Sequence, residues 1–267
     1  MKYILLAFIS IAFSILSYGQ DDTLAKYSYC IWGLQMKPTP HSISGTGFFV
    51  RNNGKLLFVT ANHVVSAWKE NGKKDEDFPN QMTIWATNQD GTINYSQQIL
   101  IDITNVKKYA PFPVGAVVPD IVSLEVFVPT DIVIYSLENY FSAYYPKDPE
   151  SIVIFGYPGI ANVKDGNNII NSSIKLKFTE SPIYINYPTL DSNSIEHIDS
   201  INYLLEIDTA TLKSDTLKGY SGSVVFINDK KTKKWMIMGI FSQVLNHQYL
   251  MFLKPEYIIN ALKTPYK

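Results

Sequence analysis

Short runs of β-branched and aromatic residues recur along the chain, and Gly, Pro, Asn and Asp separate them. This alternation is typical of β-strands joined by turns. The runs expected to form strands are residues 47–50, 55–60, 82–86, 121–128, 151–155, 173–178, 203–207, 224–227, 235–241 and 249–253. Many short strands with few helices predict an all-β fold, either a sandwich or barrels.

Helical periodicity is confined to two places. Near the C-terminus Pro255 can begin a helix. Over residues 255–263 one face of this helix would be apolar, formed by Tyr257, Ile258, Ala261 and Leu262. A shorter helix is expected over residues 64–68. Such a small helical content agrees with the all-β prediction.

The composition indicates a folded domain and excludes two classes of partner. Hydrophobic residues make up 46% of the chain and aromatic residues 13%, which is enough for a sizeable core and unlike a disordered chain. The formal net charge is −1, so bulk electrostatics recruits neither nucleic acid nor an anionic membrane. The lysines within residues 230–234 are expected at a solvated hairpin tip.

Two polar stretches, residues 69–81 and 186–200, are expected to be surface loops. Residues 137–150 contain no clear strand and join two strand-rich halves. We therefore expect an N-terminal half over residues 40–136, a C-terminal half over residues 150–254 and a terminal helix.

The N-terminus has the pattern of a signal peptide. Lys2 is followed by an apolar run over residues 3–16, and small residues precede a predicted cut after Gly19. A membrane-spanning helix needs about 20 apolar residues, so cleavage is favoured over the alternative of an uncleaved anchor. The mature chain is expected to be secreted or periplasmic, with no stable membrane insertion.

The mature chain has one cysteine, Cys30, so no intrachain disulfide is possible. Its apolar neighbours favour a small buried residue over a nucleophile. Histidines occur at four scattered positions, without an HExxH motif or paired CxxC motifs. No metal and no other cofactor is expected.

Ser221 lies in the segment GYSGSVV, where glycines at positions 219 and 222 flank the hydroxyl and an apolar strand follows. Glycines allow a sharp turn and the close approach of a substrate carbonyl. They would also let the amides of Gly219 and Ser221 point together as an oxyanion hole, worth about 3 kcal/mol per donor. Taken alone, the segment also fits a plain turn between two strands.

A serine hydroxyl needs a base, and His63 is the candidate. It follows the apolar run of residues 56–59 at the point where a helical turn is expected, although a structural histidine would fit the same place. A carboxylate must then orient the imidazole. Asp120 opens a strongly apolar strand, Asp131 has similar surroundings, and Asp102 is a weaker choice.

Several segments together resemble the trypsin-like serine peptidases of the chymotrypsin clan, in the order His, Asp, Ser. TANHV at residues 60–64 resembles their histidine box. The other matching segments are GTGFFV at 45–50, DIVSL at 120–124, GYSGSVV at 219–225 and GIF at 239–241. IFGYPG at 154–159 resembles a turn of the HtrA-like and glutamyl-endopeptidase-like bacterial branch. The resemblance covers roughly residues 40–260.

The resemblance implies two six-stranded antiparallel β-barrels packed face to face, with the active site between them. It implies a catalytic triad of His63, Asp120 and Ser221 acting on a polypeptide substrate through an acyl-enzyme. It favours Asp120 over Asp131, which lies too close to the Gly-Tyr-Pro-Gly turn. Tyr220 departs from the family pattern, which has Asp or Asn there, and we expect it to disturb the neighbouring amides.

By analogy with the same family, Asp215, Phe241, Ser242 and Gln243 are candidates for substrate binding, and His247 for reaching the cleft. Asp215 also fits an ordinary loop residue.

Two other functions fit parts of the sequence. An α/β-hydrolase would need Gly where Ser223 stands, with Asp and His after the serine, and too few residues follow Ser221. A catalytically inactive trypsin-like domain acting as a binding or adhesive module is the alternative from another class.

Overall fold

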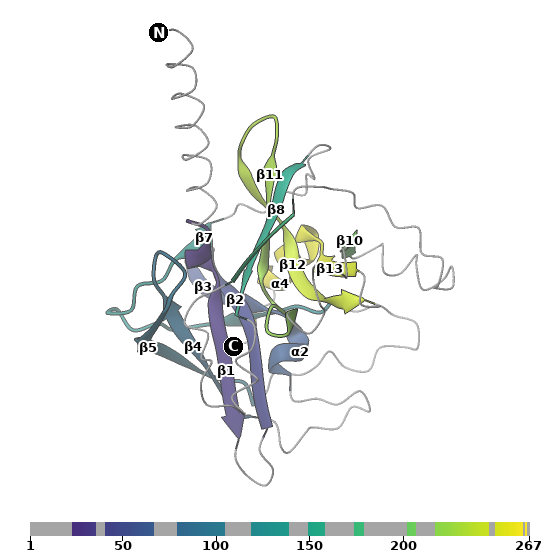
Figure 1. Ribbon diagram of the computed structural model, residues 1–267. Helices are drawn as coiled ribbons and strands as arrows, with labels where there is room; N and C mark the ends of the chain where they lie inside the picture. The colour runs from purple at the N-terminus through teal and green to yellow at the C-terminus, as the bar shows by residue number, and fades with distance from the viewer. Residues whose placement is uncertain are drawn as a thin grey trace, which may run out of the picture.

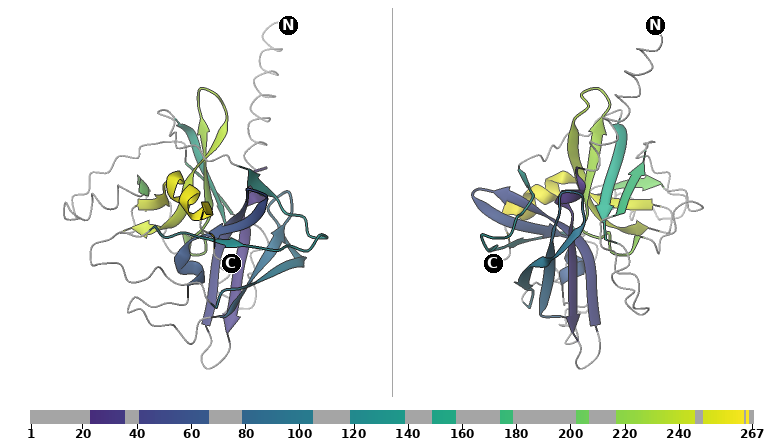
Figure 2. Two further views of the ribbon diagram at one scale, coloured as in Figure 1. Left: turned by 180° about the vertical axis from the view of Figure 1, so that it is seen from behind. Right: turned by 60° about the vertical axis from the view of Figure 1, so that its left-hand side comes forward.

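The computed structural model describes residues 23–35, 41–66, 79–104, 119–138, 149–157, 174–178, 202–206, 217–245, 249–263 and 265. Strands dominate, and they form two sheets (Figure 1). The purple and blue strands occupy one half of the molecule and the green and yellow strands the other, in Figure 1 and in both views of Figure 2. The predicted all-β fold is confirmed.

The N-terminal sheet has seven strands in the order β5-β4-β1-β2-β3-β6, with β7 paired to β2. Its pairs are antiparallel apart from β2 with β7. The strands are β1 (Tyr29–Gln35), β2 (His41–Asn52), β3 (Lys55–Thr60), β4 (Gln81–Thr87), β5 (Ile93–Asp102), β6 (Val122–Glu125) and β7 (Ser136–Glu138). Strands β1, β5 and β7 were not expected from the sequence pattern.

The C-terminal sheet has six antiparallel strands in the order β10-β13-β12-β11-β8-β9. They are β8 (Pro149–Gly156), β9 (Ile174–Phe178), β10 (Asn202–Glu206), β11 (Val224–Asp229), β12 (Trp235–Leu245) and β13 (Tyr249–Leu253). All six were expected, and residues 230–234 form the β11–β12 hairpin tip. Within the described residues each sheet has an open strand order, where closed six-stranded barrels were expected.

Three short helical elements complete the described structure: η1 (Ala25–Tyr27), α2 (Asn62–Val65) and α4 (Pro255–Lys263). Helix α2 begins before the expected residue 64, so His63 lies inside the helical turn. Helix α4 has the expected bounds and contacts β12 of one sheet and β6 of the other. None of the helices in the described ranges combines the length and the apolar character needed to cross a membrane.

One apolar cluster spans the two sheets, and each sheet also has a cluster of its own. Phe48 and Val59 of the N-terminal sheet pack in the same cluster as Phe155 and Val224 of the C-terminal sheet. The apolar face of α4 enters this cluster through Ile258, Ala261 and Leu262. The shared cluster fixes the position of the sheets, which sets the geometry of the groups along their junction.

Some predictions lie outside the described residues. These are the signal peptide over residues 1–19, Asp215, His247, the loop at 186–200 and most of the loop at 69–81. The boundary segment at 137–150 is described only at its two ends. The domain limits proposed from the sequence remain predictions.

Candidate active site

His63 and Asp120 are in direct contact. The distance from Nδ1 of His63 to Oδ2 of Asp120 is 2.6 Å, and the backbone N–H of His63 donates to Oδ1 of the same carboxylate at 2.9 Å. The His63 side chain is 41% exposed and that of Asp120 is 29% exposed. The imidazole therefore has one edge fixed by the carboxylate while the ring remains accessible.

Strand pairing explains why these two residues meet. Strand β3 ends at Thr60, which pairs with Val122 at the beginning of the neighbouring strand β6. Residues that follow β3 and residues that precede β6 therefore lie at the same end of the sheet. The turn of α2 starts there, with the N–H of Val64 bonded to the carbonyl of Ala61 at 3.2 Å, and carries His63 over Asp120.

The carboxyl group of Asp120 is held in its ionised form. Burial opposes ionisation, but hydrogen bonds from His63, its electrostatic attraction and a hydrogen bond from Ser242 outweigh burial and hold the pKa of Asp120 below its usual value. A carboxylate beside Nδ1 fixes the tautomer in which Nε2 is free to accept a proton.

Ser242 contacts both the carboxylate and the candidate nucleophile. Its hydroxyl donates to Oδ2 of Asp120 at 2.8 Å, and its carbonyl oxygen accepts a hydrogen bond from the hydroxyl of Ser221 at 3.0 Å. The pairing of β12 with β13 shifts between Phe241 and Gln243. Such an irregularity re-aims a side chain, and here the residue within it is Ser242. The sequence indicated a substrate contact for Ser242, and the contact with Asp120 was missed.

Ser221 lies in a tight turn between residues 217 and 223. Gly219 and Gly222 have φ angles of +99° and +91°, a region that strains other residues. A Cβ at Gly222 would lie 2.0 Å from the carbonyl oxygen of Thr46. The hydroxyl of Ser221 donates to the carbonyl of Ser242 and not to the ring of His63. The turn thus packs directly against strand β2 of the N-terminal sheet.

The backbone amides of this turn fall into two groups. Those of Tyr220, Gly222 and Ser223 donate to the carbonyls of Leu217, Phe241 and Tyr220 at 2.8–3.1 Å. The amides of Gly219 and Ser221 have no acceptor among the residues that the structure describes. These two N–H groups are the ones that the sequence predicted for an oxyanion hole.

Tyr220 points away from the turn into the C-terminal sheet. Its side chain is 1% exposed, its ring lies edge-on to Phe241 with centroids 6.4 Å apart, and burial raises its pKa. Gly156 faces this ring, because a Cβ there would lie 2.3 Å from the Cδ1 atom of Tyr220. The ring fills space that Gly156 leaves open. The disturbance of the Gly219 and Ser221 amides that the sequence suggested stays a prediction.

The side chains of the remaining sequence candidates have other surroundings. Phe241 is 2% exposed in the core of the C-terminal sheet, where a place in the cleft was expected, and Gln243 is exposed. Neither rival carboxylate contacts His63. Asp131 is exposed, and Oδ1 of Asp102 accepts a bond from the N–H of Thr104 at 2.8 Å. Cys30 is buried, which raises the pKa of its thiol.

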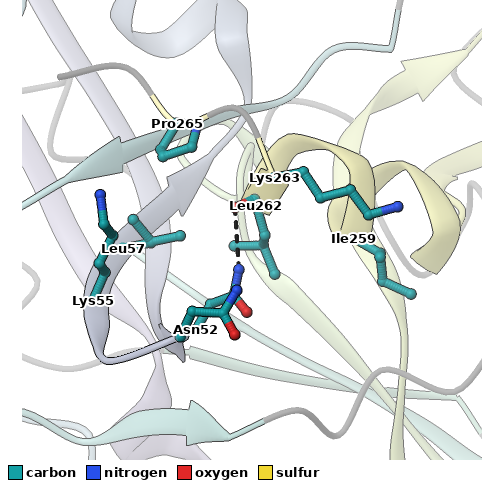
Figure 3. A pocket seen from close by; sticks show the side chains of 8 residues that line it. Asn52, Lys55, Leu57, Ile259, Leu262, Lys263 and Pro265 are labelled. Atoms are coloured by element: carbon teal, nitrogen blue, oxygen red, sulfur yellow. Dashed lines mark hydrogen bonds between the residues drawn. The ribbon is translucent and has the colours of Figure 1, made fainter.

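A cavity of about 500 Å³ lies between the β2–β3 turn and the C-terminal end of α4 (Figure 3). In Figure 3 the amide of Asn52 bonds the carbonyl of Leu262, while the stems of Lys55 and Lys263 border the opening. Lys55 begins β3 and His63 follows its other end. This cavity is therefore separate from the His63–Asp120 pair.

Comparison with known proteins gives a likeness of fold. No protein-family model matches the chain, and no curated protein matches it significantly. The solved structure of GrC has a TM-score of 0.55 and 14% identity, covering 91% of this chain and 94% of that one. A thermostable serine protease, AL20, from an extremophilic microorganism has a TM-score of 0.54 and 9% identity, covering 90% of this chain and 97% of that one. The chain has the two-lobed fold of trypsin-like serine proteases.

Proposed function

We propose that the chain is a secreted serine endopeptidase that hydrolyses peptide bonds with His63, Asp120 and Ser221. The observation that carries the proposal is the 2.6 Å contact between Nδ1 of His63 and the ionised Asp120, beside the turn that holds Ser221. A trypsin-like fold supports it, as does the order of the three residues. Secretion rests on the signal peptide predicted from the sequence, and membership of the HtrA-like or glutamyl-endopeptidase-like branch rests on the resemblance alone.

The reaction follows from the roles of these groups. Nε2 of His63 takes the proton of the Ser221 hydroxyl while Oγ attacks the carbonyl carbon of the scissile bond. The imidazolium, stabilised by Asp120, then protonates the leaving amine, and an acyl-enzyme ester remains. Water loses a proton to the same nitrogen and attacks the ester. The ester bond then breaks, the imidazolium returns a proton to Oγ of Ser221, and the carboxylic product leaves. No cofactor takes part.

The first step requires the Ser221 hydroxyl to leave the carbonyl of Ser242. A rotation about the Cα–Cβ bond moves Oγ between staggered positions, and the hydrogen bonds of a catalytic site commonly tighten only when substrate binds. The negative oxygen that forms on the substrate would accept bonds from the amides of Gly219 and Ser221. Each such donor contributes about 3 kcal/mol to transition-state stabilisation.

A fluorophosphonate probe tests this function, because it reacts with a serine only where a base activates the hydroxyl. The mature chain should be labelled at Ser221, as located by mass spectrometry of its peptides. His63→Ala and Ser221→Ala should abolish the labelling. Asp120→Asn should slow it by roughly 10³- to 10⁴-fold, while the matched change Asp131→Asn should leave it unaltered.

The hydrogen bond from Ser221 to the carbonyl of Ser242 favours a second candidate, the inactive binding module. A hydroxyl held permanently in that bond would be no nucleophile. Equal absence of labelling in the folded wild-type chain and in His63→Ala would support this candidate and reject the endopeptidase.

A further inference from the structure

Thr46 connects the N-terminal sheet to the turn that carries Ser221. It belongs to β2, and its side chain is fully buried. Its hydroxyl donates to the carbonyl of Gly219 at 2.7 Å and accepts a bond from the N–H of Tyr157 at 3.2 Å. Its own N–H donates to the carbonyl of Ser221 at 2.9 Å. One residue of one sheet therefore binds the two carbonyls that flank Tyr220.

These bonds restrict the orientation of the turn. The carbonyl of Gly219 and the N–H of Tyr220 belong to one peptide unit, which Thr46 binds at one end and the carbonyl of Leu217 at the other, 3.1 Å from the nitrogen. The following unit is bound through the carbonyl of Tyr220 by the N–H of Ser223 at 2.8 Å. A planar peptide held at both ends cannot flip without breaking a bond.

The hydrogen bonds of the Thr46 hydroxyl depend on its oxygen and its proton. Val has the same shape as Thr but offers no donor and no acceptor. With Val at position 46, the Gly219 carbonyl and the Tyr157 N–H would both lose their bonds to this side chain, and the peptide unit of residues 219–220 would be held from the Leu217 side only.

We propose that Thr46 is a positioning residue for the oxyanion hole: its hydroxyl fixes the Gly219–Tyr220 peptide so that the amides of Gly219 and Ser221 stay aimed at the reacting carbonyl. This role rests on the proposed peptidase function. The Thr46 hydroxyl stabilises the transition state more than the bound substrate, because negative charge on the substrate's carbonyl oxygen develops only as the serine attacks.

Thr46→Val tests the proposal through the kinetics of peptide hydrolysis. We expect kcat to fall by roughly 10- to 100-fold with KM within about twofold of the wild-type value. Thr46→Ser keeps the hydroxyl, so its kcat should stay within about threefold of the wild-type value. The pH at which kcat is half-maximal should not move, because the His63–Asp120 pair is unchanged.

Thr87→Val is the matched control. Thr87 is also buried, and its hydroxyl donates to the carbonyl of Ser28 at 2.8 Å, but it has no bond to the turn of residues 217–223. The same substitution there should lower the free energy of unfolding while kcat stays within about twofold. An equal loss of kcat in both variants, or no loss in folded Thr46→Val, would overturn the proposal.

Amide hydrogen exchange separates this proposal from the proposed function. In Thr46→Val the exchange of the Tyr220 N–H should accelerate by about tenfold or more, because the turn opens more often, and Thr87→Val should show no such change at Tyr220. This result is independent of catalysis. Inactive wild-type protein would reject the peptidase, whereas unchanged exchange would reject the role of Thr46.

Discussion

At the scale of single residues, the chemistry of the site depends on how Asp120 stays ionised under partial burial. Three groups donate to its two oxygens: the N–H and the ring of His63, and the hydroxyl of Ser242. Hydrogen bonds to a charged group typically contribute about 1.5–3 kcal/mol each. They outweigh the cost of desolvation, so the pKa of Asp120 lies below its ordinary value in the folded chain.

A lowered pKa makes stability depend on pH with a defined sign. The unfolded chain binds the proton of Asp120 at a higher pH than the folded chain does, so the stabilisation is fully present above about pH 4 and disappears as pH falls through the folded pKa. We expect Asp120→Asn to lower the free energy of unfolding by about 2 kcal/mol at pH 7 and by much less at pH 2.5.

Urea unfolding at both pH values measures this difference. The variant Asp131→Asn serves as the control, because this exposed carboxylate should change stability by less than about 0.5 kcal/mol at either pH. If wild type and Asp120→Asn differ in the free energy of unfolding by the same amount at pH 7 and pH 2.5, the pKa of Asp120 is not lowered in the folded chain.

At the scale of elements, the end of β8 and the Ser221 turn fit together through a glycine and a ring. Gly156 is the last residue of β8, and the Tyr220 ring occupies the place where a side chain at position 156 would point. The tyrosine therefore belongs to the packing of the C-terminal sheet, and Gly156 is the residue that makes room for it.

A double-mutant cycle tests this fit. Gly156→Ala should cost about 1–3 kcal/mol in the free energy of unfolding, because the added methyl overpacks against the Tyr220 ring. Tyr220→Ala should cost about 3–5 kcal/mol through the cavity it leaves. In the Tyr220→Ala background, Gly156→Ala should cost under about 1 kcal/mol. Chemical denaturation of the wild type, the two single variants and the double variant gives the four free energies of unfolding. Additive costs of the two substitutions would refute the contact.

At the scale of the whole molecule, Tyr157 joins the two sheets. It follows β8 and is fully buried, and its hydroxyl lies 3.1 Å from the carbonyls of Ser28 and Gly91, next to the N-terminal sheet. Thr46 binds its backbone N–H. Because one apolar cluster also spans both sheets, we expect them to unfold as a single cooperative unit.

Tyr157→Phe should lower the free energy of unfolding by about 1–2 kcal/mol, because it removes the hydroxyl and leaves buried carbonyls without that donor. Tryptophan fluorescence, to which Trp32 and Trp85 of the N-terminal sheet and Trp235 of the C-terminal sheet contribute, and far-UV circular dichroism should give one common midpoint, shifted to lower urea. The control Tyr95→Phe, at a side chain that is 46% exposed, should keep the wild-type midpoint. Two separate transitions in the wild-type chain would show instead that the sheets unfold independently.

The sequence by itself predicted the parts of this protein that depend on neighbouring residues. Alternating apolar residues and turn residues predicted all six strands of the C-terminal sheet and helix α4, because their side-chain pattern is read within one element. Strand β5 was not predicted because its middle, around Ser96 and Gln97, is polar. Its pairing with β4 stabilises it. Strand β7 has three residues, too few for a pattern, and exists through its pairing with β2.

The candidate site divides in the same way. His63, Asp120 and Ser221 were each recognised from a short local segment and its resemblance to a family. The contacts of Ser242 with Asp120 and of Thr46 with Gly219 span 122 and 173 positions. They depend on strand register, on the irregularity in β12 and on how one sheet packs against the other. Only the tertiary structure decided them, because a hydrogen bond between distant residues is set by the path of the whole chain and leaves no mark in the sequence around either partner.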